Sequence, residues 1–128
     1  MKRQLLTIIA TLICAVVGAA GQPAKPQEQA VIVHFLYGSR DWKPFFSFEE
    51  KLENAIHASG VGEYDGNELA ADGSDGFLYM YAPDAERLFK LVRPYLEGNA
   101  LLKNVVVTIR YGAADDPKVK ERVVKLGT

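Results

Sequence analysis

The chain has 128 residues, which suits one domain, and a formal charge of −1 from 15 basic and 16 acidic residues. This near balance argues against a nucleic-acid-binding protein, and the ordinary content of 11 glycines and 6 prolines excludes collagen-like and low-complexity classes. A single cysteine excludes an intramolecular disulfide framework.

Residues 1–20 are typical of a secretory signal peptide. Lys2 and Arg3 precede an apolar run over 5–17, and small residues follow at 18–21. A basic start, an apolar stretch of about 7–15 residues and small residues before a cleavage site direct a chain to export. The run is shorter than the ~20 residues that span a bilayer, so cleavage is favoured over an uncleaved membrane anchor. We therefore expect a periplasmic or secreted protein, which would touch the membrane only if the signal segment stayed uncleaved. The other 108 residues carry a charge of −3.

Cys14 raises the alternative of a lipid-modified cysteine. The bacterial lipoprotein pattern has a small residue directly before the cysteine and leucine three positions before it, whereas this chain has Ile13 and Thr11 there. Cys14 also lies inside the apolar run, so it would be removed with the signal. The exported chain is then expected to contain no cysteine.

Residues 21–29 are predicted to be a flexible linker, because their prolines and charged side chains cannot build a packed element. A single folded domain is expected over 30–128. It begins with a strand over 30–38 that is rich in β-branched and aromatic residues and ends at Gly38. Apart from His34 this strand is apolar on both faces, which is typical of a strand in the middle of a sheet.

The first helix is predicted to begin at Ser47. Residues 39–46 indicate a loop, in part because Pro44 restricts the residue before it. Ser47 and Glu50 then form a capping-box pattern. Gly60 is suited to the left-handed cap that ends the helix. Apolar residues at helical spacing predict a buried stripe of Phe48, Leu52, Ala55 and Ile56.

Two strands and a second helix follow. Glycines and polar residues over 61–71 predict a weak, irregular edge strand, and a turn over 72–76 leads into an apolar strand over 77–82. Asp84 is the expected N-cap of the second helix, in which Pro94 predicts a kink, or an end near Arg93 with one further turn. The predicted buried stripe of this helix is Leu88, Leu91, Val92, Tyr95 and Leu96.

The last predicted elements are a strong strand over 104–112, a turn over 113–117 and an alternating strand over 118–126. The resulting order is β-α-β-β-α-β-β, and its first six elements match the split βαβ, or ferredoxin-like, plan. That plan places its first and third strands at the sheet centre, and the two least polar predicted strands occupy those places. We therefore expect an α+β, ferredoxin-like sandwich in which an antiparallel sheet, extended by a C-terminal strand, carries two helices on one face.

The alternation of side chains along the strands predicts which face the helices leave open. The wholly apolar sets of the first strand and of 104–112 should lie beneath the helices. The strand over 77–82 is ambiguous, and its tyrosines are assigned outward because a tyrosine hydroxyl requires water or a partner. The expected open face carries Ile32, His34, Leu36, Tyr79, Tyr81, Thr108 and Arg110.

Such a face is too apolar to remain in water without a reason. A second copy packed sheet against sheet, a protein or peptide partner, and a small molecule are the three candidate occupants. Single-strand RNA binders also carry aromatic residues on an open sheet, but the export signal and the acidic charge argue against nucleic acid. In the loop before the first helix, Trp42 either covers the end of the core or acts as a contact residue. The predicted binding residues are His34, Trp42, Tyr79, Tyr81 and Arg110.

Few residues point to catalysis. Histidine as a residue type suits acid–base chemistry, so His34 is a candidate general base. Glu63 and Asp65 would share one side of a strand, where paired carboxylates can do acid–base work. A hydrogen-bonded sheet histidine and a charged edge strand that resists unwanted pairing are the structural alternatives. His57 lies off the apolar stripe and is expected to be solvated.

The acidic segment near Asp65 fits a calcium loop poorly, because Leu69 stands where an oxygen ligand is required. The sequence holds no phosphate loop, nucleophile elbow or zinc pattern. We therefore expect no cofactor, no metal site and no assigned catalytic residue. The predicted function is that of a small exported, non-catalytic binding domain, which uses its open face for self-association or for a protein or peptide partner. The alternative is a small hydrolase- or isomerase-like enzyme with His34 and Glu63/Asp65 as acid/base groups.

Overall fold

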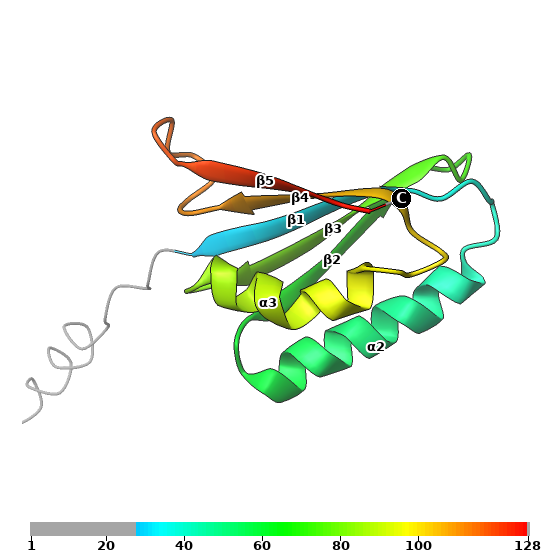
Figure 1. The fold of residues 1–128 in the computed structure, drawn as a ribbon, viewed down its shortest axis with the longest axis horizontal. Coiled ribbons are helices and arrows are strands. Elements are labelled where there is room, and N and C mark those ends of the chain that lie inside the picture. The colour runs from blue at the N-terminus through cyan, green and yellow to red at the C-terminus, as the bar shows by residue number, and fades with distance from the viewer. Residues whose placement is uncertain (1–27, 128) are drawn as a thin grey trace, which may run out of the picture.

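A computed structural model describes residues 28–127 of the chain. The expected signal segment, Cys14 and most of the expected linker lie outside the described residues. Within the described range the chain forms five strands and two helices (Figure 1). Their order is β1 (Gln29–Leu36), α2 (Lys43–Ser59), β2 (Glu63–Leu69), β3 (Asp75–Ala82), α3 (Ala85–Leu96), β4 (Lys103–Arg110) and β5 (Glu121–Leu126).

The strands form one sheet in the order β2-β3-β1-β4-β5, in which every neighbouring pair is antiparallel. Both α2 and α3 lie on the same side of this sheet (Figure 1). The α+β architecture with an antiparallel sheet is therefore confirmed. The two least polar predicted strands are adjacent inside the sheet as β1 and β3, and the predicted weak strand is at an edge as β2.

The side chains of the inner strands alternate between the helices and the opposite face. Val31, Val33 and Phe35 of β1 are fully buried, whereas Ile32 and His34 between them are half-buried. The same alternation buries Leu78 and Met80 of β3 and leaves its tyrosines partly exposed, and it recurs along β4. The predicted faces are thus confirmed, and the core lies between α2, α3 and one side of the sheet.

The predicted start of the first helix is wrong, because α2 begins at Lys43 rather than at Ser47. Pro44 lies in the first turn, where its missing N–H costs nothing. The N-cap residue Trp42 makes no side-chain capping bond, but the carboxylate of Asp41 accepts a hydrogen bond from the Lys43 N–H at 3.1 Å, so one N–H of the first turn is satisfied. The earlier start brings Phe45 into the core, where it is fully buried and stacks on Phe35 with ring centroids 5.4 Å apart. The left-handed cap at Gly60 is confirmed, with φ +67°.

The two helix starts give a direct test of this difference. Ser47→Ala is expected to change the free energy of unfolding by less than about 0.5 kcal/mol, because Ser47 is an exposed residue within α2. Asp84→Ala is expected to cost about 1 kcal/mol, because the Asp84 carboxylate accepts from the Arg87 N–H at the start of α3. Urea unfolding followed by circular dichroism measures both. A loss near 1 kcal/mol for Ser47→Ala would mean that Ser47 caps the helix, as the capping-box pattern predicts.

The second helix departs from its predicted stripe. It continues without interruption to Leu96 with Pro94 inside its last turn, so it does not end near Arg93 as the second of the two expected outcomes had it. Tyr95 is 39% exposed and not buried, whereas Phe89 is 4% exposed and belongs to the core. The guanidinium group of Arg122 from β5 lies 5.9 Å from the centroid of the Phe89 ring. The buried stripe is rotated toward β5 because this fifth strand widens the sheet beyond α3.

The remaining differences concern the ends of the strands. β4 ends at Arg110 and β5 begins at Glu121, so both are shorter than predicted. Asp116 holds the intervening turn, since its carboxylate accepts from the Lys118 N–H at 2.9 Å. Over the described range, neither α2 nor α3 is both long and apolar enough to cross a membrane.

Candidate functional site

The candidate site is the sheet surface opposite α2 and α3, named here the open face. The register aligns its side chains in rows that cross all five strands. One row is Glu63, Tyr81, Ala30, Arg110 and Glu121, the next is Gly66, Tyr79, Ile32, Thr108 and Val123, and the third is Glu68, Phe77, His34, Val106 and Lys125. Asp75, Leu36 and Lys103 complete the face at the far end of β1.

The middle of the open face is apolar and aromatic. Val123 is 57% exposed and Leu36 is 39% exposed, while Ile32 and Val106 are half-buried between them. The rings of Phe77 and Tyr79 stack at 6.2 Å along β3. These side chains come from four adjacent strands, and large apolar surfaces of this kind mark contact sites.

The charged residues of the open face are segregated by sign. The margin formed by β2 and β3 is acidic, and the margin formed by β4 and β5 is basic apart from Glu121. Because the two margins lie on opposite sides of β1, the face has an electrostatic polarity across its strands. The acidic margin consists of Glu63, Glu68 and Asp75, and the basic margin consists of Lys103, Arg110 and Lys125.

His34 lies at the centre of this face and makes a hydrogen bond from Nε2 to Oδ2 of Asp75 at 2.8 Å. Both side chains are about one-third exposed. The ring of His34 also contacts Phe77, with centroids 4.6 Å apart. The cross-strand neighbours of His34 in its row are Phe77 and Val106, neither of which can be a nucleophile. The arrangement therefore holds the imidazole in place against β3.

The register separates His34 from the carboxylates with which it was expected to act. Glu63 lies opposite Tyr81, whereas His34 lies opposite Phe77, two strands and four residues away. Strand spacing and rise place the Cα atoms of Glu63 and His34 about 16 Å apart. Asp65 is the extra residue of a bulge in β2. The carboxylate that reaches His34 is instead Asp75, which the sequence placed in a turn.

Tyr79 and Tyr81 both point to the open face, as predicted. The Tyr79 hydroxyl donates a hydrogen bond to Glu68 across the β2–β3 pair. This bond and the nearby carboxylate charge raise the pKa of Tyr79 to about 12, so its ring stays neutral at physiological pH. On the other side of β1, Arg110 donates from Nε to the Gly112 carbonyl oxygen at 3.2 Å. The four predicted residues on this face therefore include two aromatic side chains and one guanidinium group.

Trp42 does not join these residues. Its ring stacks on Tyr37 with centroids 4.2 Å apart and meets the edge of Phe45 at 5.5 Å. Tyr37 and Phe45 belong to the core on the helix side of the sheet. The structure thus places Trp42 over the end of the core, away from the open face.

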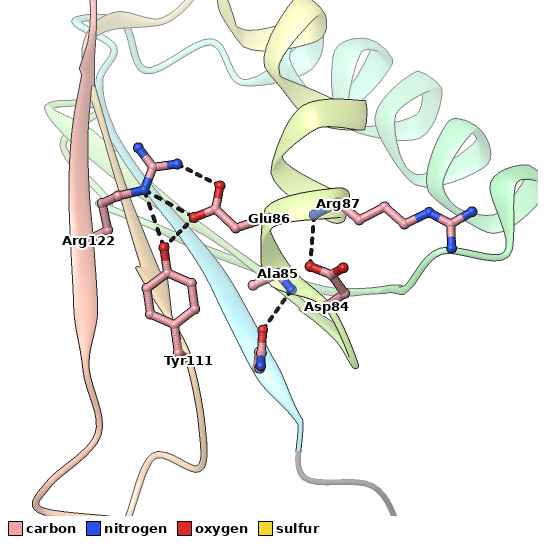
Figure 2. A network of polar contacts seen from close by, with 7 residues as sticks. Asp84, Ala85, Glu86, Arg87, Tyr111 and Arg122 are labelled. Atoms are coloured by element: carbon pink, nitrogen blue, oxygen red, sulfur yellow. Dashed lines mark hydrogen bonds and ion pairs between the residues drawn. The ribbon is translucent and has the colours of Figure 1, made fainter.

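A second polar cluster lies on the helix side and joins α3 to β5 (Figure 2). Arg122 donates from Nη2 to Glu86 Oε1 at 2.7 Å and from Nε to Glu86 Oε2 at 3.0 Å, and the Tyr111 hydroxyl also donates to Glu86. The bonds from Arg122 and Tyr111 lower the pKa of the Glu86 carboxyl. A groove of about 520 Å³ runs beside this cluster, between Phe89, Arg93 and Arg122. The charges of Arg122 and Glu86 pair with each other, so the cluster fastens β5 to α3.

No group of three or more potential metal ligands is formed by residues 28–127. Comparisons of the chain with protein-family models, with curated proteins and with solved structures give no match.

Proposed function

We propose that this protein is an exported domain that acts by binding and not by catalysis, and that a second copy of the chain covers its open face. The proposed export rests on the signal-like residues 1–20. We further infer a ferredoxin-like split βαβ unit with one added strand. The order β2-β3-β1-β4 supports that plan, with β5 added beside β4.

The observation that carries the binding function is the apolar surface on the side of the sheet that no helix covers. Moving the exposed side chains of Val123 and Leu36 out of water lowers the free energy of the system. The aromatic residues beside them offer large rigid contact areas. Within residues 28–127 no polar or charged residue is buried, so the core itself has no unmet polar requirement. The uncovered face is thus the part of the fold that still lacks a packing partner.

Self-association is favoured over another protein partner by the polarity of the face. A surface that is acidic along one margin and basic along the other can complement a second copy of itself. A partner of different sequence would need its own surface with an acidic margin and a basic margin in matching positions, which a second copy already has. The two apolar centres would then meet in the middle, as in sheet-on-sheet packing.

Analytical ultracentrifugation of the full chain tests this function. The wild type is expected to show a monomer–dimer equilibrium, and Tyr81→Ala is expected to raise the dissociation constant at least about tenfold, because tyrosine is a frequent interface anchor. Tyr95→Ala is the matched control, since Tyr95 is 39% exposed on α3, away from the open face. Circular dichroism confirms that both variants fold. A wild type that stays monomeric at several hundred micromolar, or equal weakening by both variants, would reject the proposal.

A further inference from the structure

We infer that the two copies pack open face to open face about a two-fold axis that runs parallel to the strands and over β1. This inference rests on the proposed self-association and specifies its geometry. It names which margin of one copy meets which margin of the other, and therefore which pairs of residues decide the affinity.

Two symmetric arrangements keep the strands of the packed sheets nearly aligned. Face-to-face sheets align to within about 30°, and a closed dimer is related by a two-fold axis. If the axis is parallel to the strands, β2 of one copy lies on β5 of the other. If the axis is perpendicular to the strands within the interface, β2 lies on β2 and β5 lies on β5.

The segregated charges select the first arrangement. With the axis parallel to the strands, the acidic margin of each copy faces the basic margin of the other. The perpendicular axis reverses the order of the rows, so Glu63 of one copy faces Glu68 of the other, and like charges brought together across an interface are strongly unfavourable. Its favourable pair, Lys125 with Glu121, only offsets this repulsion, whereas the parallel axis brings Asp75 onto Lys103 as well as Glu68 onto Lys125. The axis passes over β1 because this central strand lies midway between the margins, which gives the largest overlap.

A two-fold axis parallel to the strands preserves the position of each residue along the strands, so each row meets the same row of the second copy. Glu68 then faces Lys125, and Tyr81 faces Arg110, which suits a cation–π contact. In the middle row the exposed Val123 faces Gly66, where the absence of a side chain leaves room.

One corner of the interface does not fit. Glu63 of one copy faces Glu121 of the other, because Glu121 is the one acidic residue at the otherwise basic margin. The arrangement therefore predicts that removing this repulsion strengthens the dimer. Such a gain is a sharper test than a loss, because few unrelated effects produce it.

The size of the face sets the expected affinity. Five strands and six residues of rise along β1 span about 24 Å by 20 Å, which is about 500 Å² for each copy. The total of about 1,000 Å² is at the lower limit for a specific interface. We therefore expect a dissociation constant in the micromolar range, where single charge changes are readily measured.

A charge exchange between Glu68 and Lys125 tests the arrangement in the full chain. In Glu68→Lys or in Lys125→Glu alone, two like-charged pairs replace two opposite pairs, so each variant is expected to self-associate at least about tenfold more weakly than the wild type. In an equimolar mixture of the two variants both pairs are again opposite, and the mixed dimer is expected to approach wild-type affinity. Glu121→Lys alone is expected to tighten the dimer several-fold. Lys51→Glu, an exposed change on α2, is the control and leaves the affinity unchanged.

The outcomes separate this inference from the proposed function. Sedimentation of the wild type as a monomer rejects both. If Tyr81→Ala weakens the dimer but the mixed charge variants bind no more tightly than each alone, the open face remains the interface. The two-fold axis parallel to the strands is then overturned. Tightening by Glu68→Lys alone would indicate the perpendicular axis instead.

Discussion

Phe45→Ala is expected to lower the free energy of unfolding by about 3 to 5 kcal/mol, the range for removing a large buried ring. Phe45 is fully buried at the start of α2 and, besides the adjacent Phe46, has four aromatic neighbours at the end of the core. Its removal would leave a cavity that these rings cannot fill without leaving their packed positions. These neighbours are Phe35, Tyr37, Trp42 and Phe48.

Phe46→Ala is the matched control, because Phe46 is the next residue of the same helix and is 49% exposed. It is expected to change the free energy of unfolding by less than about 1 kcal/mol. Chemical denaturation of both variants measures the difference. Similar losses for both residues would mean that Phe45 does not contribute more to the core than its exposed neighbour.

Gly73→Ala is the second large effect, with an expected loss of about 2 to 5 kcal/mol from a left-handed backbone and a steric clash. Gly73 has φ +78°, and a Cβ atom there would lie 2.1 Å from the Ser39 carbonyl oxygen. The Gly73 carbonyl oxygen also accepts hydrogen bonds from the N–H groups of Gly38 and Ser39, at 2.7 and 3.2 Å. The loop after β1 therefore has no room to retreat from an added methyl group.

Gly38→Ala separates the two causes. Gly38 is also left-handed, with φ +87°, but a Cβ atom there would meet nothing within 4 Å. We expect a loss of only about 1 to 2 kcal/mol, the cost of the backbone conformation alone. Thermal unfolding of both variants gives the comparison. A Gly73→Ala protein as stable as Gly38→Ala would show that the turn before β3 does not pack against the loop after β1.

The loss at Gly73 would also affect the open face. Residues 70–75 lead directly into β3, and Asp75 at the start of β3 holds His34. A displaced turn would therefore move the carboxylate that positions the central histidine. The stability of this end of the sheet and the shape of the proposed interface depend on the same few backbone contacts.

The sequence by itself determined the faces of the inner strands. Side chains alternate strictly along a strand, so Val31, Val33 and Phe35 had to share one face and Ile32 and His34 the other. The outward assignment of Tyr79 followed from the hydroxyl, which the structure pairs with Glu68. These are local properties, and they do not depend on the order of the strands.

The start of α2 is a local property that a second local signal obscured. The capping-box pattern at Ser47 competes with a longer apolar stripe that includes Phe45. Burial of that ring favours the longer helix, because it contributes more than one capping bond. Only the packing against Phe35 shows which signal prevails.

The tertiary structure alone decided which distant residues share the open face. The contact between His34 and Asp75 depends on the register of β1 against β3, and strand patterns do not encode a register between separated segments. The polarity of the face likewise depends on the order β2-β3-β1-β4-β5, which puts acidic strands on one side of β1 and basic strands on the other. Alternation along one strand is fixed by backbone geometry, but the arrangement across strands is fixed only when long-range hydrogen bonds and core packing form together.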